Sequence, residues 1–271
     1  MDLGIKNVVL GTAIGYGIRE LNNFVKSFRE FNREDDIVLI VDKDNSLFEF
    51  FDRYDVTPIF FESRFFMDTH INNARFIRYL EFLLDNITRY DRVFLTDTRD
   101  IVFQADPFEG LSIDCMHFFA EDDTTTIGSD QAYNSPWIRM VFGDEVYEQL
   151  KDQRIICAGT TLGGTGNVMK YLNMMVDVFR QLKEKNPNAY RTNVDQGIHN
   201  YIAHSTNRYF SDGTIKDNGD IVGTIGLTLT KDPSKIRVVD GAVHVGDMRP
   251  AVIHQYDRSA ELIELYHKKY E

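Results

Sequence analysis

Three charged side chains stand between two apolar runs in the stretch RYDRVFLTDTRDIVFQADPF. Val93–Leu95 and Ile101–Phe103 have the composition of buried strands, and Asp97, Arg99 and Asp100 lie between them. Because a core strand does not tolerate unpaired charges, the chain must turn here into a solvated cleft or meet a positive group. Carboxylates on a short loop suit a hard divalent cation, Mg²⁺ or Mn²⁺, which keeps positions for water and substrate phosphates.

A purely structural interpretation of these acids is also open. Asp97 and Asp100 could be turn and cap residues that pair with Arg99 and Arg92, since a lone D-x-x-D pattern is a weak motif. Against this, Asp106 adds a third carboxylate nearby in the sequence. Clustered carboxylates repel one another unless a cation lies among them.

The elements that must position these acids alternate through the first hundred residues. Strands separated by helices of this length imply right-handed crossovers and a mostly parallel sheet. Ligands bind beyond the carboxyl ends of such strands, and Asp97 follows the fourth one directly. Periodicity predicts strands at 6–12, 37–41, 57–61 and 92–96, and helices at 18–31, 46–54 and 70–86.

The second half of the chain has a more mixed pattern. Trp137 follows Asn134-Ser135-Pro136 in a loop-like region, where it could stack on a sugar ring or anchor the loop in the core. The sequence contains no repeat, low-complexity tract or linker, so we expect one α/β domain over residues 1–271. We expect strands at 116–120, 154–159 and 239–252, the last with a hairpin turn at Asp240-Gly241, and helices at 167–185, 194–204 and 259–269.

Composition limits the classes of function. The 271 residues are 43% hydrophobic and 13% aromatic, which indicates a globular protein. The net charge of −12 argues against nucleic acid as the main partner. Two cysteines, Cys115 and Cys157, are too few for a disulfide framework and fit a reducing compartment. Without a signal-peptide pattern or an apolar run of about 18 residues, we expect a cytoplasmic protein with no membrane span.

The segment Val93–Asp97, an apolar run followed by an acid, resembles the strand and DxD motif of GT-A-fold glycosyltransferases. Enzymes of this family take a sugar from a nucleotide diphosphate. Small bacterial and chlorovirus-type enzymes are among those it is similar to. The resemblance extends over nearly the whole chain and implies a single Rossmann-like GT-A domain. Six further segments carry it in the family's order: Val8–Ala13, Asp42, Asn73–Arg75, Cys157–Thr161, Asn193–Gly197 and Val252–Tyr256.

This resemblance implies roles for individual residues. Asp97, Asp100 and His254 would hold Mn²⁺ or Mg²⁺, and Asp195 and Gln196 would lie beside the reacting sugar in the retaining arrangement. Residues 1–108 would bind the nucleotide, with UDP favoured, and residues 109–271 would bind a glycan or other hydroxyl acceptor. Donor contacts are implied for Gly11, Thr12, Ala13, Asp42, Arg75, Thr96, Asp97 and Arg99.

One departure from the family pattern leaves two alternatives. Arg99 holds the position of the second acid, so either the turn brings Asp100 round to the metal or Arg99 neutralises part of the diphosphate. His254 could instead be a core histidine. Asp195, or Asn193 before it, could cap the following helix.

Other polar residues have less specific interpretations. The acidic run Glu121–Asp123 could hold sugar hydroxyls or form a solvated turn. His244 is a poorer candidate for a metal ligand than His254, because the family resemblance does not extend to it. Three other histidines are expected to have structural roles. Those three histidines are His117, His199 and His204.

Rival functions fit the pattern less well. The loop Gly11–Gly17 is not the G-x-G-x-x-G of a dinucleotide-binding oxidoreductase. A phosphotransferase with an aspartate nucleophile would place its acids after the first strand rather than the fourth. A non-catalytic carbohydrate- or nucleotide-binding α/β protein remains the alternative, and it would lack a metal–diphosphate site.

Overall fold

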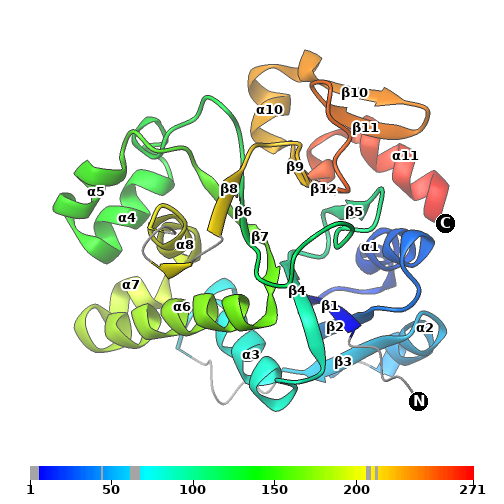
Figure 1. Ribbon diagram of the computed structural model, residues 1–271, viewed down its shortest axis with the longest axis horizontal. Helices are drawn as coiled ribbons and strands as arrows, with labels where there is room; N and C mark the ends of the chain where they lie inside the picture. Colours follow the sequence, from blue (N-terminus) through cyan, green and yellow to red (C-terminus); the bar gives the residue numbers. More distant parts are fainter. Residues whose placement is uncertain (1–5, 44, 62–67, 206–208, 211–212) are drawn as a thin grey trace.

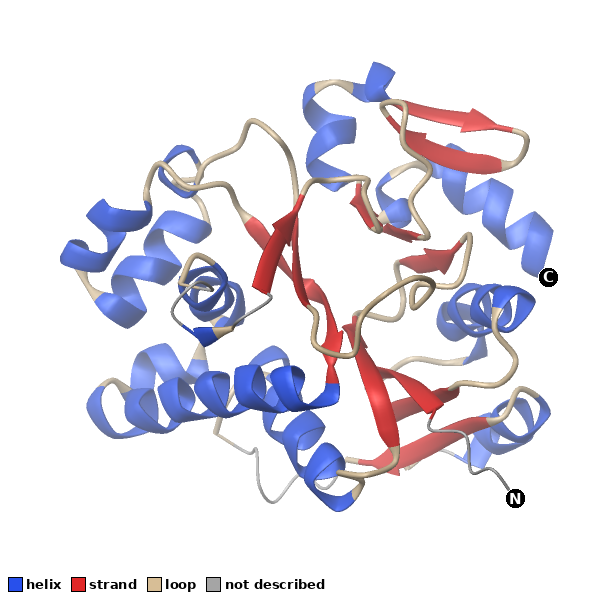
Figure 2. Cartoon of the chain, viewed as in Figure 1, coloured by secondary structure: helices blue, strands red, loops and turns tan. Residues whose placement is uncertain are grey.

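The computed structural model describes residues 6–43, 45–61, 68–205, 209–210 and 213–271. A seven-stranded mixed sheet forms its centre, with helices packed on both faces (Figure 1, Figure 2). Within the described ranges, no helix is both long and apolar enough to cross a membrane.

The central sheet confirms the predicted mostly parallel arrangement. Its first four strands in space pair in parallel, and so do the last two, whereas β7 runs antiparallel to both of its neighbours. From β1 the chain adds β2 and β3 on one side and then β4 on the other. The carboxyl ends of β1 and β4 therefore border a topological switch point, which is where α/β sheets bind ligands. In spatial order the strands are β3 (Val56–Phe60), β2 (Asp36–Val41), β1 (Lys6–Ala13), β4 (Tyr90–Thr96), β7 (Ile156–Gly164), β6 (Met116–Ala120) and β8 (Gly213–Lys216).

Alternating side chains of the strands supply two cores. In β1, Val8 and Leu10 face one core while Val9 faces the other, as the period of two along a strand requires. The first core is covered by α3 (Ile71–Asp85), α6 (Thr165–Lys185) and α8 (Asp195–Ala203), and the second by α1 (Ile18–Phe31) and α2 (Phe48–Arg53).

Two small sheets, formed mainly by the C-terminal half, were not resolved from the sequence. The predicted strand 239–252 is wrong as one continuous element. A hairpin turns at Asp240 and Gly241, whose φ angles of 52° and 77° fit the predicted turn, and a separate strand begins at Val252. The hairpin is β10 (Ile236–Val239) and β11 (Ala242–Val245), and the other sheet is β5 (Ile101–Phe103), β12 (Val252–His254) and β9 (Val222–Thr224).

The region around Trp137 also differs from the prediction. It is helical rather than loop-like: Trp137 lies in α4 (Asn134–Phe142), half-buried, packs against the first core and lies 5.5 Å from the ring of Tyr133. Pro136 is tolerated because it lies in the first turn, where its missing N–H has no helical partner to lose. The remaining elements are α5 (Asp144–Leu150), α7 (Pro187–Arg191), α10 (Gly226–Lys231), α11 (Ala260–Tyr270), and the 3₁₀ turns η1 (Asn45–Leu47), η3 (Ile127–Ser129), η4 (Pro233–Lys235) and η5 (Tyr256–Arg258).

Candidate active site

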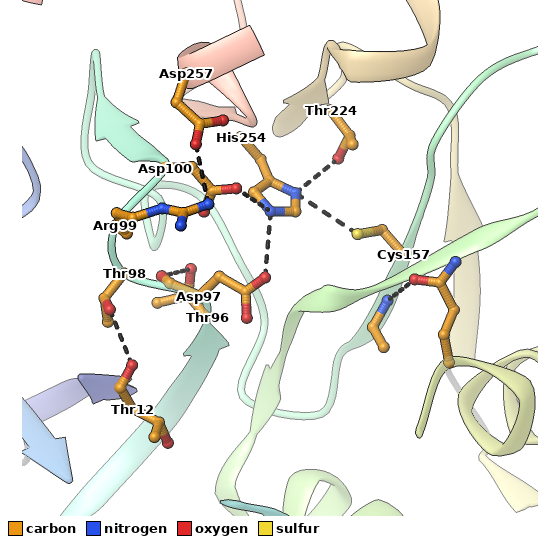
Figure 3. Close-up of polar contacts among 12 residues, drawn as sticks. Thr12, Thr96, Asp97, Thr98, Arg99, Asp100, Cys157, Thr224, His254 and Asp257 are labelled. Carbon is orange, nitrogen blue, oxygen red and sulfur yellow. Dashed lines mark hydrogen bonds and ion pairs between the residues drawn. The ribbon is translucent and has the colours of Figure 1, made fainter. Parts of the chain in front are cut away.

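The charged segment between β4 and β5 forms a tight turn at the carboxyl edge of the sheet. The Asp97 amide donates to the Gly159 carbonyl of β7 at 2.7 Å, which fixes the start of the turn. The Thr98 hydroxyl donates to the Thr12 carbonyl of β1 at 2.9 Å (Figure 3). Asp97 therefore lies beyond the ends of β1 and β4, as predicted.

Asp97, Asp100 and His254 come together at this turn. His254 Nε2 lies 3.4 Å from Asp97 Oδ2 and 3.8 Å from Asp100 Oδ2. One ligand atom of each residue lies within 4.8 Å of the others. Antiparallel pairing of β12 with β5 sets His254 opposite Ile101, which follows Asp100 in the chain, so a contact between distant segments completes the cluster.

The chemistry of this cluster fits a divalent cation. His254 Nε2 is buried, and its polar contacts within the described structure are those to the carboxylates of Asp97 and Asp100, at 3.4 and 3.8 Å. Burial, opposed by His254 and reinforced by Asp97, raises the pKa of Asp100. Burial would lower the pKa of His254, but Cys157, Asp100 and Asp97 raise it well above its ordinary value. Both shifts favour the protonated forms, so a cation bound here would displace these protons, and the two carboxylates suit Mn²⁺ or Mg²⁺.

A buried guanidinium links this cluster to Asp195. Arg75, from α3, forms ion pairs with Asp97 and, at 2.9 Å, with Asp195. Although burial would lower it, the pKa of Arg75 is raised by these two carboxylates. Burial would raise the pKa of Asp97, but Arg75 and His254 lower it. The pKa of Asp195 is raised by burial despite Arg75.

This contact excludes the alternative that Asp195 or Asn193 caps α8. Val194 is the N-cap residue, and the start of the helix has no side-chain cap. Asp195 is 4% exposed and faces Arg75, and the side-chain oxygen of Asn193 accepts no hydrogen bond within the described structure. Gln196 is anchored more loosely: its amide accepts from Ala158 N–H at 3.4 Å and donates to the Asn134 side chain at 3.3 Å.

A polar cavity of about 260 Å³ opens beside the acid cluster. Five of the predicted site residues line it, namely Thr12, Arg75, Asp97, Arg99 and Asp100. The sequence did not single out the other lining residues as site residues, although two of them lie in the four residues after His254 and two lie in the loop after the first strand. These are Ile14, Tyr16, Ile71, Asn72, Thr98, Gln255 and Arg258.

The other predicted donor contacts do not line the cavity. Gly11 lies beneath the turn, where a Cβ atom would come within 2.5 Å of Thr98. Ala13 is buried, and the Thr96 hydroxyl donates to the Asp97 carbonyl at 2.9 Å. The carboxylate of Asp42 accepts the Gly15 amide. These four residues shape the loops around the cavity.

Arg99 forms its ion pair outside the acid cluster. Its guanidinium pairs with Asp257 at 3.0 Å, whereas the turn carries Asp100 toward His254 (Figure 3). The alternative in which Asp97 and Asp100 pair with Arg99 and Arg92 is wrong for Arg92, which donates to the Leu111 carbonyl.

The acidic run after β6 is not a solvated turn throughout. Glu121 is buried, hydrogen-bonded to Gln196 and Cys157, and burial raises its pKa. Burial alone would raise the pKa of Asp122, but hydrogen bonds led by Thr125, together with Lys231, lower it to about 2. The third acid of the run is exposed.

Three further histidines have structural surroundings, as expected. His199 is fully buried against the Tyr171 hydroxyl at 2.7 Å, and burial lowers its pKa to about 3. His117 contacts the Thr214 hydroxyl and His204 the Arg154 carbonyl. His244 lies in β11, outside the acid cluster.

Comparison with known proteins places the chain by its fold. No protein-family model and no curated protein sequence matches it. Among solved structures, an active-site glutamine-to-glutamate mutant of LgtC superposes with a TM-score of 0.60 at 15% identity, covering 96% of this chain and 94% of that one. The galactosyltransferase LgtC in complex with donor and acceptor sugar analogues gives 0.56 at 14% identity, covering 96% and 95%.

A third solved structure extends this likeness. The glycosyltransferase GlyE of Streptococcus pneumoniae TIGR4 gives a TM-score of 0.53 at 15% identity, covering 98% of this chain and 60% of that one. The chain thus spans less than two thirds of GlyE but nearly all of LgtC. The predicted architecture is confirmed: the chain has the GT-A fold of these glycosyltransferases.

Proposed function

We propose that the protein is a glycosyltransferase that moves a hexose from a nucleotide diphosphate donor, with UDP favoured, to a hydroxyl of a glycan or other acceptor. The observation that carries this proposal is the cluster of Asp97, Asp100 and His254, whose buried Nε2 faces both carboxylates, beside a polar cavity at the switch point of a GT-A fold. The LgtC structure with donor and acceptor sugar analogues supports it by analogy of fold.

The acid cluster would hold Mn²⁺ or Mg²⁺ through Asp97, Asp100 and His254. When bound, the cation supplies Lewis-acid stabilisation of the negative charge on the diphosphate leaving group. Arg99 lines the same cavity as Asp97 and Asp100, so it would contact the diphosphate as a bidentate donor. Asp257 holds the Arg99 guanidinium in place before the donor binds.

The donor would lie over the ends of β1 and β4. Thr12 lines the cavity and would contact the nucleotide directly. Gly11, Ala13, Thr96 and Asp42 would act on the donor through the loops that they shape. Residues 1–108 supply most of the cavity lining, which favours this half as the nucleotide-binding part and residues 109–271 as the acceptor-binding part.

Sugar transfer would take place beside Asp195 and Gln196, with retention of anomeric configuration. An inverting enzyme needs a carboxylate base within hydrogen-bond reach of the acceptor hydroxyl. Asp195 is paired with Arg75, and Glu121 is buried and hydrogen-bonded to Gln196 and Cys157; neither lines the cavity where an acceptor hydroxyl could reach it. The Gln196 amide, oriented by Asn134, would hydrogen-bond the transferring sugar. An active-site glutamine also features in the mutant LgtC structure.

We also propose the cytoplasm as the compartment. Cys115 and Cys157 are both buried, and no disulfide joins them. Buried thiols that stay reduced fit a reducing environment.

A hydrolysis screen tests the proposed function directly. Purified protein is incubated with a panel of UDP-, GDP- and other nucleotide sugars in Mn²⁺ or in EDTA, and release of the nucleotide is measured. We expect slow hydrolysis of one donor in Mn²⁺ only, and calorimetry should show UDP binding that requires Mn²⁺. Absence of both Mn²⁺-dependent UDP binding and hydrolysis of any donor would favour the non-catalytic alternative, which lacks a metal–diphosphate site. UDP binding that is unchanged by EDTA would reject the metal site.

A further inference from the structure

The imidazole of His254 is contacted at both nitrogens. Its Nε2 faces Asp97 and Asp100, while its Nδ1 lies 3.3 Å from Thr224 Oγ1 and 3.6 Å from Cys157 Sγ (Figure 3). His254, Thr224 and Cys157 are at most 2% exposed, so these contacts are shielded from bulk solvent. A ring that binds a cation through Nε2 must keep its lone pair there, and its one proton is then on Nδ1.

We propose that Thr224 is a positioning residue whose hydroxyl oxygen accepts a hydrogen bond from the Nδ1–H of His254, with Cys157 packed beside it, and thereby fixes the ring with Nε2 toward the cation. This inference rests on the proposed metal site. A hydroxyl oxygen is a better acceptor than a thiol sulfur, so Thr224 carries most of the orienting effect. Hydrogen bonds to the distal nitrogen of a metal-binding histidine set both its tautomer and its basicity.

Thr224 is itself held by a buried amide. The side chain of Asn218 accepts the Thr224 N–H at 2.8 Å and donates to the Thr224 carbonyl at 2.9 Å. The same amide donates to the Glu121 carbonyl at 2.9 Å, at the end of β6. Thr224 is also the register partner of His254 in the parallel pairing of β9 with β12. The hydroxyl is therefore fixed opposite the imidazole by two independent sets of backbone contacts.

Metal affinity in matched variants tests this role. Thr224→Val keeps the shape of the side chain and removes the hydroxyl, whereas Thr224→Ser keeps the hydroxyl. Binding of Mn²⁺ is measured from the electron paramagnetic resonance signal of the free ion, without donor or turnover. We expect Thr224→Val to weaken Mn²⁺ binding by about 10- to 100-fold. Thr224→Ser should stay close to wild type, and Cys157→Ala should lose less than Thr224→Val.

A second readout observes the tautomer in the wild-type protein. In the Mg²⁺ complex, ¹⁵N correlation spectra of the histidine rings should show the His254 proton on Nδ1. A proton on Nε2 would overturn the inference, whether or not a variant folds. Wild-type Mn²⁺ affinity in folded Thr224→Val would also overturn it and leave the proposed function standing. Failure of the wild-type protein itself to bind Mn²⁺ would remove the metal site, and this inference with it.

Discussion

Gly159 gives a test of the acid cluster that alters none of its ligands. It lies in β7, directly beneath Asp97 and His254. A Cβ atom at this position would come within 2.5 Å of Asp97 Oδ2 and 2.7 Å of His254 Cε1. Its backbone is that of an ordinary strand, so alanine at 159 would not strain the main chain. Gly159→Ala therefore perturbs the cluster through space alone.

The expected magnitude follows from these distances. Non-bonded atoms are comfortable at about 3.5 Å, so the two ligands must retreat by about 1 Å. Overpacking of this kind costs about 1–3 kcal/mol of stability, which a domain of this size can tolerate. A displacement of about 1 Å in a catalytic group costs about 10²-fold in turnover. We therefore expect Gly159→Ala to fold, to bind Mn²⁺ at least about 10-fold more weakly and to lose most transfer activity.

A glycine elsewhere supplies the matched control. Gly166, in the first turn of α6, has open space around its Cβ position, so Gly166→Ala should leave Mn²⁺ affinity unchanged and raise stability by up to about 1 kcal/mol. Calorimetric Mn²⁺ titrations and denaturant unfolding of both variants give the comparison. If Gly159→Ala binds Mn²⁺ and turns over like wild type, the cation is not held by Asp97 and His254 in the observed arrangement.

Three further outcomes are expected. Asp97→Asn should abolish transfer and metal-dependent nucleotide binding but preserve the circular dichroism spectrum, because the amide oxygen still accepts from buried Arg75; normal turnover in that variant would refute the site. Asp100→Asn should weaken Mn²⁺ binding strongly, whereas Arg99→Ala should spare the metal and weaken UDP, and calorimetric titrations showing the reverse pattern would make Arg99 the substitute for the second acid. Asp122→Asn should destabilise the protein by about 1–2 kcal/mol at neutral pH. The pKa of the Asp122 carboxyl is lower in the folded protein than in the unfolded chain, so its ionised form stabilises the fold at every pH above the unfolded pKa. Denaturant unfolding should show this deficit shrinking from about pH 5 toward pH 2, and a deficit independent of pH would mean that its charge contributes nothing.

Local patterns in the sequence determined the first half of the fold. Helical spacing in 18–31 and the apolar run 37–41 needed no tertiary information, because burying an apolar face dictates the period along each element. Strand–helix alternation then fixed the parallel sheet and its ligand-binding edge. Asp97 could be placed at that edge from the sequence because it directly follows a predicted buried strand.

Non-local pairing decided the rest. Which acid joins Asp97 depended on the turn after β4, and this turn sends Asp100 toward His254 and Arg99 toward Asp257. The antiparallel register of β12 with β5 brings His254 to the acids, and no local pattern encodes a pairing between segments so far apart in the chain. The contact of Asp195 with Arg75 likewise required the first residues of α8 to meet α3. A side chain's type and its place on an element follow from local periodicity, whereas its partners follow from which distant segments pack together.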